Sequence, residues 1–169
     1  MTNRSALFLL PLFLFALAPG EAAAKVLSTH ADWTAIEERE GANKVCFVAT
    51  APAKSEGKYT KRGDVFLLVT HRPAEKATGV VSIQTGYTYK ARSDAAARIG
   101  TQTFRLFTDG ENAWARDDAT DRALIQAMRK GANMVVTGTS SRGTRTTDTY
   151  SLSGFSAAYR AASKACGVK

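Results

Sequence analysis

The side chains in this sequence that could do acid–base or metal chemistry are few. The two histidines, His30 and His71, are far from the H-x-H or H-x-x-x-H spacing of a metal site, and neither cysteine has a C-x-x-C partner. We therefore expect no metal and no cofactor. A Ser/His/Asp site built from His71, Asp148 and a serine would have to assemble in space, because no nucleophile motif is present. The sequence predicts a protein that is not an enzyme, with a hydrolase whose site assembles only in the fold as the alternative.

Positive charge is the one surplus that the composition leaves unexplained. The chain has 169 residues, and 23 Lys and Arg against 15 Asp and Glu give a formal charge of +8. The basic residues gather in a long loop and around a hairpin turn, and we predict a polyanion-binding surface made of Lys54, Lys58, Lys61, Arg62, Arg142 and Arg145. A solvated basic surface that keeps the protein soluble accounts for the same charges. Nucleic acid is not an expected partner, because aromatic and basic residues do not interleave as in RNA-binding motifs.

Residues 1–24 have the layout of a secretory signal peptide. Arg4 is followed by an uncharged run, Ala6–Ala18, and then by a Pro-Gly break and small residues. The run is too short to cross roughly 30 Å of hydrocarbon as a helix. We predict one exported domain, residues 25–169, in the periplasm or on the outer surface. Arg4 and Glu21 both leave with the leader, so the charge of +8 belongs to the domain.

Export limits the polyanions that the predicted surface can meet to those outside the cytoplasm. We expect an envelope component or a host-surface polyanion, and peripheral membrane contact at most. A further alternative is a binding module that inhibits or chaperones another envelope protein. An exposed apolar patch or a free sheet edge would favour this alternative.

Two cysteines, Cys46 and Cys166, remain after the leader. An exported compartment allows a disulfide to form and persist, whereas two buried free thiols are the other interpretation. A bond closing a loop of about 120 residues would stabilise the fold by nearly 5 kcal/mol at most in the chain-entropy model. Cys166 lies about 20° from the face of Phe155 on a C-terminal helix, so its sulfur points with the apolar stripe. We predict that the bond joins this helix to an early strand.

Short runs of β-branched and aromatic residues recur along the domain and predict an antiparallel β-sandwich or partly closed barrel. The predicted strands are 32–37, 44–50, 64–71, 79–87, 102–108, 112–116, 133–139 and 144–152. Glu40–Asn43, Asp109-Gly110 and Ser140–Gly143 are predicted hairpin turns. Ala51–Gly63 is predicted to be a loop, and Ala91–Gly100 a second connection with a possible helical turn.

Two segments favour helices over strands. Residues 118–130 begin with aspartates, carry apolar residues at helical spacing and end in Arg129-Lys130 before a glycine. Residues 154–166 form the C-terminal helix, for which Ser153 is a candidate N-cap. We expect this second helix to pack on the sheet.

Several short motifs in this order resemble the invasion-associated locus B family of exported alphaproteobacterial proteins. They are Asp32-Trp33-Thr34, the strand Lys44–Val48, and the closing stretch from Thr139 through Tyr150 and Phe155 to Cys166. The resemblance implies a small β-sandwich at the periplasm or outer surface and, for pathogenic members, a role in host-cell invasion. Ile36 and Glu37 stand where the family often has a cysteine, so a second, local disulfide is absent.

Overall fold

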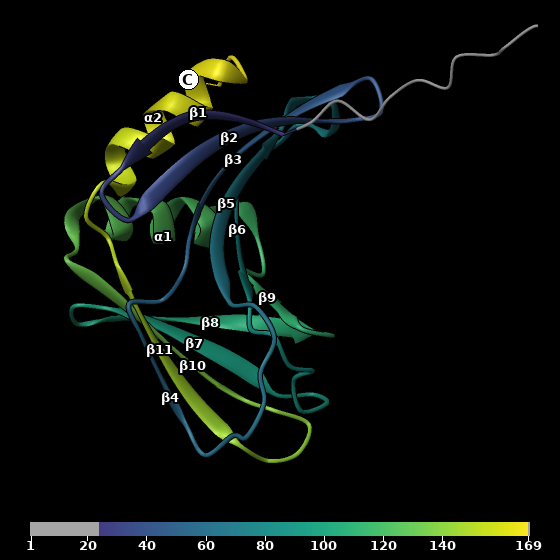
Figure 1. Cartoon of the computed structure of the whole chain (residues 1–169), viewed down its shortest axis with the longest axis vertical. Helices are drawn as coiled ribbons and strands as arrows, with labels where there is room; N and C mark the ends of the chain where they lie inside the picture. Colours follow the sequence, from purple (N-terminus) through teal and green to yellow (C-terminus); the bar gives the residue numbers. More distant parts are fainter. Residues whose placement is uncertain (1–23, 169) are drawn as a thin grey trace, which may run out of the picture.

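A computed structural model of the chain describes residues 24–168 and forms them into one sheet with two α-helices (Figure 1). The predicted leader, residues 1–24, lies outside the described residues except for its last one. The strands are β1 (Lys25–His30), β2 (Trp33–Glu40), β3 (Asn43–Thr50), β4 (Lys54–Gly57), β5 (Phe66–Arg72), β6 (Ala77–Gln84), β7 (Asp94–Ile99), β8 (Gln102–Asp109), β9 (Asn112–Trp114), β10 (Asn133–Thr139) and β11 (Arg145–Ser151). The helices are α1 (Asp118–Lys130) and α2 (Phe155–Ala165), with a short 3-10 turn at Pro73–Glu75.

The predicted class is confirmed: the described residues are mainly β and antiparallel, with one internal and one C-terminal helix. The strand order is β1-β2-β3-β5-β6-β9-β8-β7-β10-β11-β4, so β1 and β4 are the ends of a single sheet that does not close. The sheet is strongly curved, with β1, β2, β3, β5 and β6 toward one end of the molecule and β4, β7, β8, β10 and β11 toward the other (Figure 1). The curvature gives the sheet an inner face on which side chains can form one core.

Two strands occupy segments that were expected to be connections. β7 lies in Ala91–Gly100, where alanines and an acidic start favour a helical turn. It pairs with β8 on one side and β10 on the other, and Ala95, Ala97 and Ile99 alternate into the core. A place between two strands therefore overrides the local preference of alanine. β4 lies in Ala51–Gly63, and its partner β11 is ninety residues away in sequence, which no local pattern indicates.

Trp33 connects the two ends of the domain within the core. Its side chain is fully buried, its ring centroid lies 4.9 Å from that of Phe155 at the start of α2, and its Nε1 donates to the carbonyl of Ser151 at 3.0 Å. A single indole thus ties β2 to the end of β11 and to the helix that follows. The hydrogen bond satisfies the one polar atom of an otherwise apolar side chain.

Helix α1 begins and ends where the sequence predicts. Asp117 is its N-cap, and the carboxylate accepts the backbone N–H of Thr120 at 2.7 Å. Asp121 does more than complement the helix dipole, because the residue is only 7% exposed and its carboxylate accepts the backbone N–H of Val81 on β6 at 2.8 Å. Burial raises the pKa of Asp121 to about 6. One side chain therefore both docks the helix on the sheet and titrates in a mildly acidic range.

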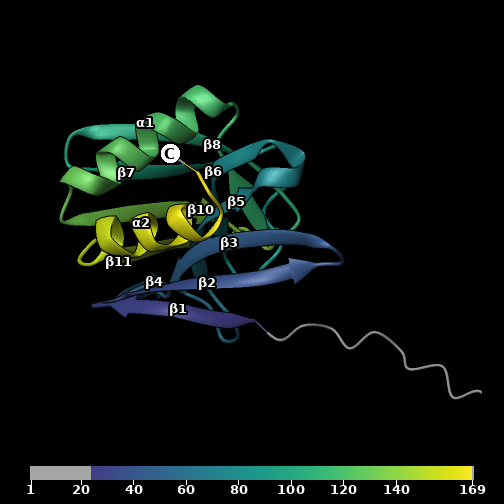
Figure 2. The same cartoon turned by 90° about the horizontal axis from the view of Figure 1, so that it is seen from above.

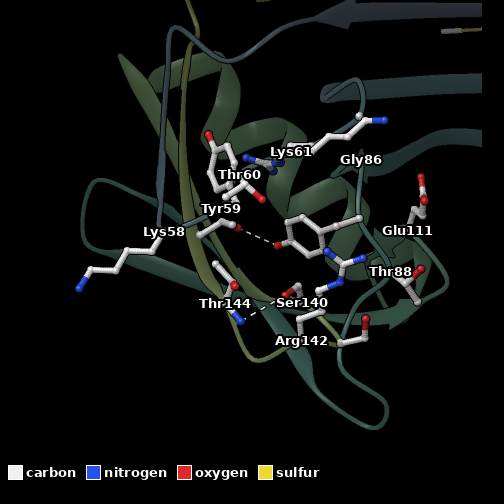
Figure 3. A pocket seen from close by; sticks show the side chains of 15 residues that line it. Lys58, Tyr59, Thr60, Lys61, Gly86, Thr88, Glu111, Ser140, Arg142 and Thr144 are labelled. Atoms are coloured by element: carbon white, nitrogen blue, oxygen red, sulfur yellow. Dashed lines mark hydrogen bonds between the residues drawn. The ribbon is translucent and has the colours of Figure 1, made fainter.

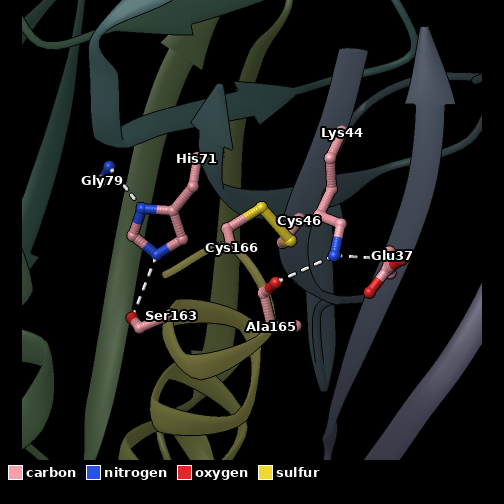
Figure 4. The surroundings of a disulfide bond; sticks show 8 residues. All are labelled: Glu37, Lys44, Cys46, His71, Gly79, Ser163, Ala165 and Cys166. Carbon is pink, nitrogen blue, oxygen red and sulfur yellow. Dashed lines mark hydrogen bonds and ion pairs between the residues drawn. A yellow bond between two sulfur atoms is a disulfide. The ribbon is translucent and has the colours of Figure 1, made fainter. Parts of the chain in front are cut away.

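Helix α2 is fixed by its ends as much as by its apolar face. Its N-cap is Gly154, at a φ of +88°, so the prediction that Ser153 caps it is wrong. A side chain at Gly154 would collide with the backbone of His30, which explains why this turn needs glycine. At the other end Lys44 donates to the carbonyl of Ala165 at 3.2 Å, a cation placed against the negative end of the helix (Figure 4).

The predicted disulfide between Cys46 and Cys166 is confirmed (Figure 4). Cys46 is fully buried on β3, and its Cα lies 5.9 Å from that of Cys166, the C-cap of α2. The bond joins residues 120 apart in sequence and holds the last helix against an early strand.

Replacing both cysteines with alanine is expected to lower the free energy of unfolding by about 2–5 kcal/mol, because a long loop closed in the unfolded state is then released. Urea unfolding of the wild type and of Cys46→Ala/Cys166→Ala, with and without reductant, measures this. Reductant should move the wild type toward the variant and leave the variant unchanged. Two reactive thiols in the denatured, unreduced wild type would contradict the bond.

The pKa of Asp121 predicts a pH-dependent stability. Between its ordinary value of 3.8 and about 6, the folded protein holds a proton that the unfolded chain has released. The free energy of unfolding therefore falls as pH rises through this window, by up to about 3 kcal/mol from this group. Asp121→Asn keeps an acceptor for Val81 and removes the titration. Urea unfolding at pH 4 and pH 7 should show a smaller loss for the variant than for the wild type, and equal losses would contradict the assignment.

Candidate anion-binding site

A pocket of about 460 Å³ lies where the segment after β4 meets the turn between β10 and β11 (Figure 3). It is lined by residues 58–63, 86–88, Glu111, Ser140–Arg142, Thr144 and Thr146. Four of its lining residues, Lys58, Lys61, Arg62 and Arg142, were predicted from two separate basic clusters. The fold brings these clusters together at one pocket.

Strand β4 is what brings the basic loop to the turn. It pairs with β11 so that Gly57 faces Thr146 and Lys54 faces Thr149, and the N–H of Ala53 donates to the carbonyl of Thr149 at 2.8 Å. The chain crosses from β3 at one end of the sheet to β11 near the other. Lys58 therefore emerges beside the β10–β11 turn that carries Arg142.

Arg62 corrects the predicted surface, because its guanidinium points into the protein. Its side chain is 6% exposed and that of Asp148 is 1% exposed. The two form a bidentate pair, with Nη1 donating to Oδ1 at 2.7 Å and Nη2 to Oδ2 at 2.6 Å, and Nε donates to the carbonyl of Thr85 at 2.6 Å. The charge of the guanidinium is neutralised, and each of its three nitrogens donates one hydrogen bond within the protein. Arg62 therefore does not belong with the cations that are free to bind a polyanion.

The buried pair also explains how a carboxylate, that of Asp148, can occupy an inward position on β11. Asp148 alternates along β11 with Thr146 and Tyr150, and all three side chains point inward. Burial alone would lower the pKa of Arg62, but the hydrogen bonds and charge of Asp148 outweigh it and hold that pKa above its usual value. A carboxylate in the core is thus satisfied by a cation delivered from the loop.

The Arg62 guanidinium makes cation–π contacts with two tyrosine rings. Its Cζ lies 5.5 Å from the ring centroid of Tyr59 and 5.1 Å from that of Tyr87. Tyr87 in turn shares a 2.7 Å hydrogen bond with the hydroxyl of Thr146 on β11, and its ring packs edge-on against Tyr89 at 5.3 Å. A cation stacked on aromatic rings is held in one orientation. These contacts anchor the loop to the pocket wall where it crosses the sheet.

The loop returns to the sheet through a contact between two glycines. The N–H of Gly63 donates to the carbonyl of Gly86 at 2.9 Å, and Gly86 has a φ of +65°. A Cβ on Gly86 would collide with the carbonyl of Gly63. Glycine is required here both by the close approach of two backbones and by the left-handed conformation.

The other predicted cations have different surroundings. Lys54 is exposed on β4 and pairs with Glu56 at 2.9 Å. Arg145 lines a shallower depression next to the pocket, together with Lys58 and Arg142. Lys58 and Lys61 extend to opposite sides of the pocket (Figure 3). Glu111 is the one acidic residue among those that line the pocket, so its lining keeps a positive balance.

Sequence reasoning missed the polar and aromatic part of the pocket. The hydroxyls of Thr60, Thr88 and Ser140 line it along with the rings of Tyr59 and Tyr87. These residues come from three separate segments with no shared motif. The one sequence signal that could have led to them is the alternation of β11, which places Asp148 on the same face as Tyr150 and so calls for a cationic partner such as Arg62.

His71 does not provide the base that a hydrolase would need. It is fully buried, Nδ1 accepts the N–H of Gly79 at 3.1 Å, and Nε2 lies 3.1 Å from the hydroxyl of Ser163 (Figure 4). With Nδ1 accepting, the neutral ring carries its proton on Nε2 and donates it to Ser163, the reverse of what nucleophile activation requires. Burial lowers the pKa of His71, which keeps the ring neutral. Asp148 is bound to Arg62 instead.

Within residues 24–168, no cluster of three or more His, Cys, Asp or Glu side chains is placed to hold a metal ion. None of the helices in the same range is long and apolar enough to span a membrane.

Asp148→Asn is expected to destabilise the protein by about 3–5 kcal/mol, because it leaves the Arg62 charge buried without its partner. Arg145→Gln is the control, since this residue is exposed on the same strand and should change stability by no more than about 0.5 kcal/mol. Urea unfolding measures both. A variant Asp148→Asn as stable as Arg145→Gln would show that the pair does not hold the loop.

One comparison with known proteins finds a relationship. No curated protein and no solved structure matches the chain. The family model described as "Invasion associated locus B (IalB) protein" matches residues 33–163, which is most of the chain. This range takes in β2 through most of α2, and with it the pocket, the Arg62–Asp148 pair and Cys46. The chain therefore belongs to the invasion associated locus B family, which is not a known enzyme family.

Proposed function

We propose that this protein is an exported, non-enzymatic member of the family that binds polyanionic glycans of the envelope or of a host surface through the pocket beside the β10–β11 turn. The observation that carries the proposal is the convergence of Lys58, Lys61 and Arg142 on one pocket from segments some eighty residues apart. Charges scattered only for solubility have no reason to gather around a concavity.

The chemistry of the pocket suits an acidic sugar chain. Lysine and arginine side chains at the rim attract sulfate, phosphate or carboxylate groups over long range. Hydroxyls from Thr60, Thr88 and Ser140 offer hydrogen bonds to sugar hydroxyls, and the ring of Tyr59 offers a flat apolar face. The Arg62–Asp148 pair beneath keeps these groups in place and contributes no net charge.

The export part of the proposal rests on the leader and on the disulfide. Residues 1–24 have the layout of a signal peptide, and the bond between Cys46 and Cys166 persists in oxidising compartments outside the cytosol. Family membership supports the same placement, and for members in pathogenic bacteria a part in contact with host cells.

A second candidate function is a module that holds or inhibits another envelope protein. One observation favours it: β1 is an end strand of the sheet, and Val26 on it is 61% exposed. An open strand edge can pair with an extended segment of a partner.

Retention on immobilised heparin tests the glycan proposal. The variant Lys58→Gln/Lys61→Gln/Arg142→Gln should elute at clearly lower salt than the wild type, with an affinity lower by about 10–100-fold, because three exposed charge contacts are lost. The matched control is Lys25→Gln/Arg39→Gln/Arg98→Gln, which removes the same charge from exposed positions that do not line the pocket. Equal elution of the two variants would mean that net charge alone retains the protein, and the proposed site would be wrong.

A further inference from the structure

A second basic groove lies on the helical side of the molecule. Helices α1 and α2 lie side by side over the sheet, with the end of the chain passing between them (Figure 2). A cavity of about 720 Å³ runs between them. It is lined by Thr78, Arg122, Ile125, Gln126, Arg129, Tyr159, Arg160, Ser163, Lys164 and Val168. No part of this lining is shared with the pocket beside the β10–β11 turn.

Within residues 24–168, no carboxylate forms an ion pair with Arg129, Arg160 or Lys164 of this groove. Four of the lining residues are basic and none is acidic. The aspartates of α1 stand at its first turn, and Asp121 faces the sheet, bound to Val81. Positive charge is therefore concentrated along the groove, and among the described residues no carboxylate that lines it offsets this charge.

The four basic residues are divided between the two helices that form the walls of the groove. Arg122 and Arg129 are seven residues apart on α1, which places them about 10 Å apart on one face. Arg160 and Lys164 are one turn apart on α2, about 6 Å along the helix. Such an array matches several anionic groups presented together better than a single small anion.

The floor of the groove is apolar and firmly packed. The guanidinium of Arg129 lies 5.0 Å from the ring centroid of Tyr159, and that ring packs at 5.2 Å against His71 below it. Ile125 and Val168 complete the apolar part. The hydroxyl of Ser163 is engaged by His71. The groove thus offers fixed cations above an apolar strip and few free hydroxyls, unlike the pocket at the β10–β11 turn.

We propose that the groove between α1 and α2 is a docking surface for a lipid bilayer rich in anionic headgroups. Cations with long aliphatic stems reach lipid phosphates from the rim of the groove, and the negative surface of such a bilayer attracts them. In Figure 1 the helices lie toward one end of the long axis and the β10–β11 turn at the other. Docking through the helices leaves the polyanion pocket facing away from the membrane.

Sedimentation with vesicles tests the proposal. The vesicles are phosphatidylglycerol mixed with phosphatidylcholine, and phosphatidylcholine alone. The variant Arg129→Gln/Arg160→Gln/Lys164→Gln should partition onto the anionic vesicles about 100-fold less than the wild type, because each basic residue near such a surface contributes about fivefold. The control Lys25→Gln/Arg39→Gln/Arg98→Gln, with the same net charge, should lose less than tenfold. Arg160→Gln/Lys164→Gln, which leaves the Arg129–Tyr159 contact intact, should lose about 25-fold.

Three outcomes would overturn the membrane assignment. They are equal losses in the groove and control variants, equal binding to neutral and anionic vesicles, and a loss of heparin retention in the groove variant as large as its loss of vesicle binding. The last would make the groove a general polyanion site. The pocket variant Lys58→Gln/Lys61→Gln/Arg142→Gln should keep vesicle binding near the level of the control. The two proposals therefore fail separately, one on heparin and the other on vesicles.

Discussion

The buried pair of Arg62 and Asp148 is the interaction on which the candidate site depends. A sheet that ends in β1 and β4 has no closing hydrogen bonds to hold its far strands and loops together. Arg62 supplies a link from the loop after β4 to the side chain of β11 and to the carbonyl of Thr85 beyond β6. Because both charges are withdrawn from water, the pair is costly to break once it has formed. That cost keeps the loop, and with it Lys58 and Lys61, at the mouth of the pocket.

The basic residues behind the net charge of +8 have two kinds of role, and Arg62 illustrates the first. Some cations are used to build the fold: Arg62 pairs with Asp148, Arg72 with Glu40, and Lys44 with the end of α2. Others remain free, at the β10–β11 turn and in the groove between the helices. Cations that are already paired inside the protein cannot attract a ligand. Both proposed binding sites lie where, among the described residues, basic side chains without an ion pair line a concave surface.

The disulfide and Trp33 fix the helical half of the molecule in a similar way. The bond from β3 holds the end of α2, while Trp33 contacts its beginning. With both ends of α2 held, the wall of the groove that carries Arg160 and Lys164 is fixed against the sheet. The two basic sites thus rest on different supports, a buried ion pair at one end of the molecule and a covalent bond with an aromatic contact at the other.

Local patterns were enough to predict much of the secondary structure. The span of α1 follows from its first-turn aspartates and final basic residues, β10 from its β-branched alternation, and the link from Cys46 to Cys166 from the position of Cys166 on the apolar face of α2. Prediction failed at three strands. It did not include β1, it missed β7, whose alanines favour a helix in isolation, and it missed β4, whose pairing depends on a strand about ninety residues away. These strands exist because neighbouring strands satisfy their backbone groups, which short-range propensity does not register.

By itself the sequence determined that the domain is basic, mainly β and bridged by one possible disulfide, and it identified the segments that carry the surplus charge. It did not distinguish Arg62 from Lys58 and Lys61, since all lie in one loop with the same sign of charge. Only the tertiary structure decided that Arg62 turns inward to Asp148 and that Arg142 joins the lysines from the far side of the pocket. The physical reason is that the role of a charged side chain depends on whether a partner and a low-dielectric environment surround it, and both are supplied by residues distant in sequence.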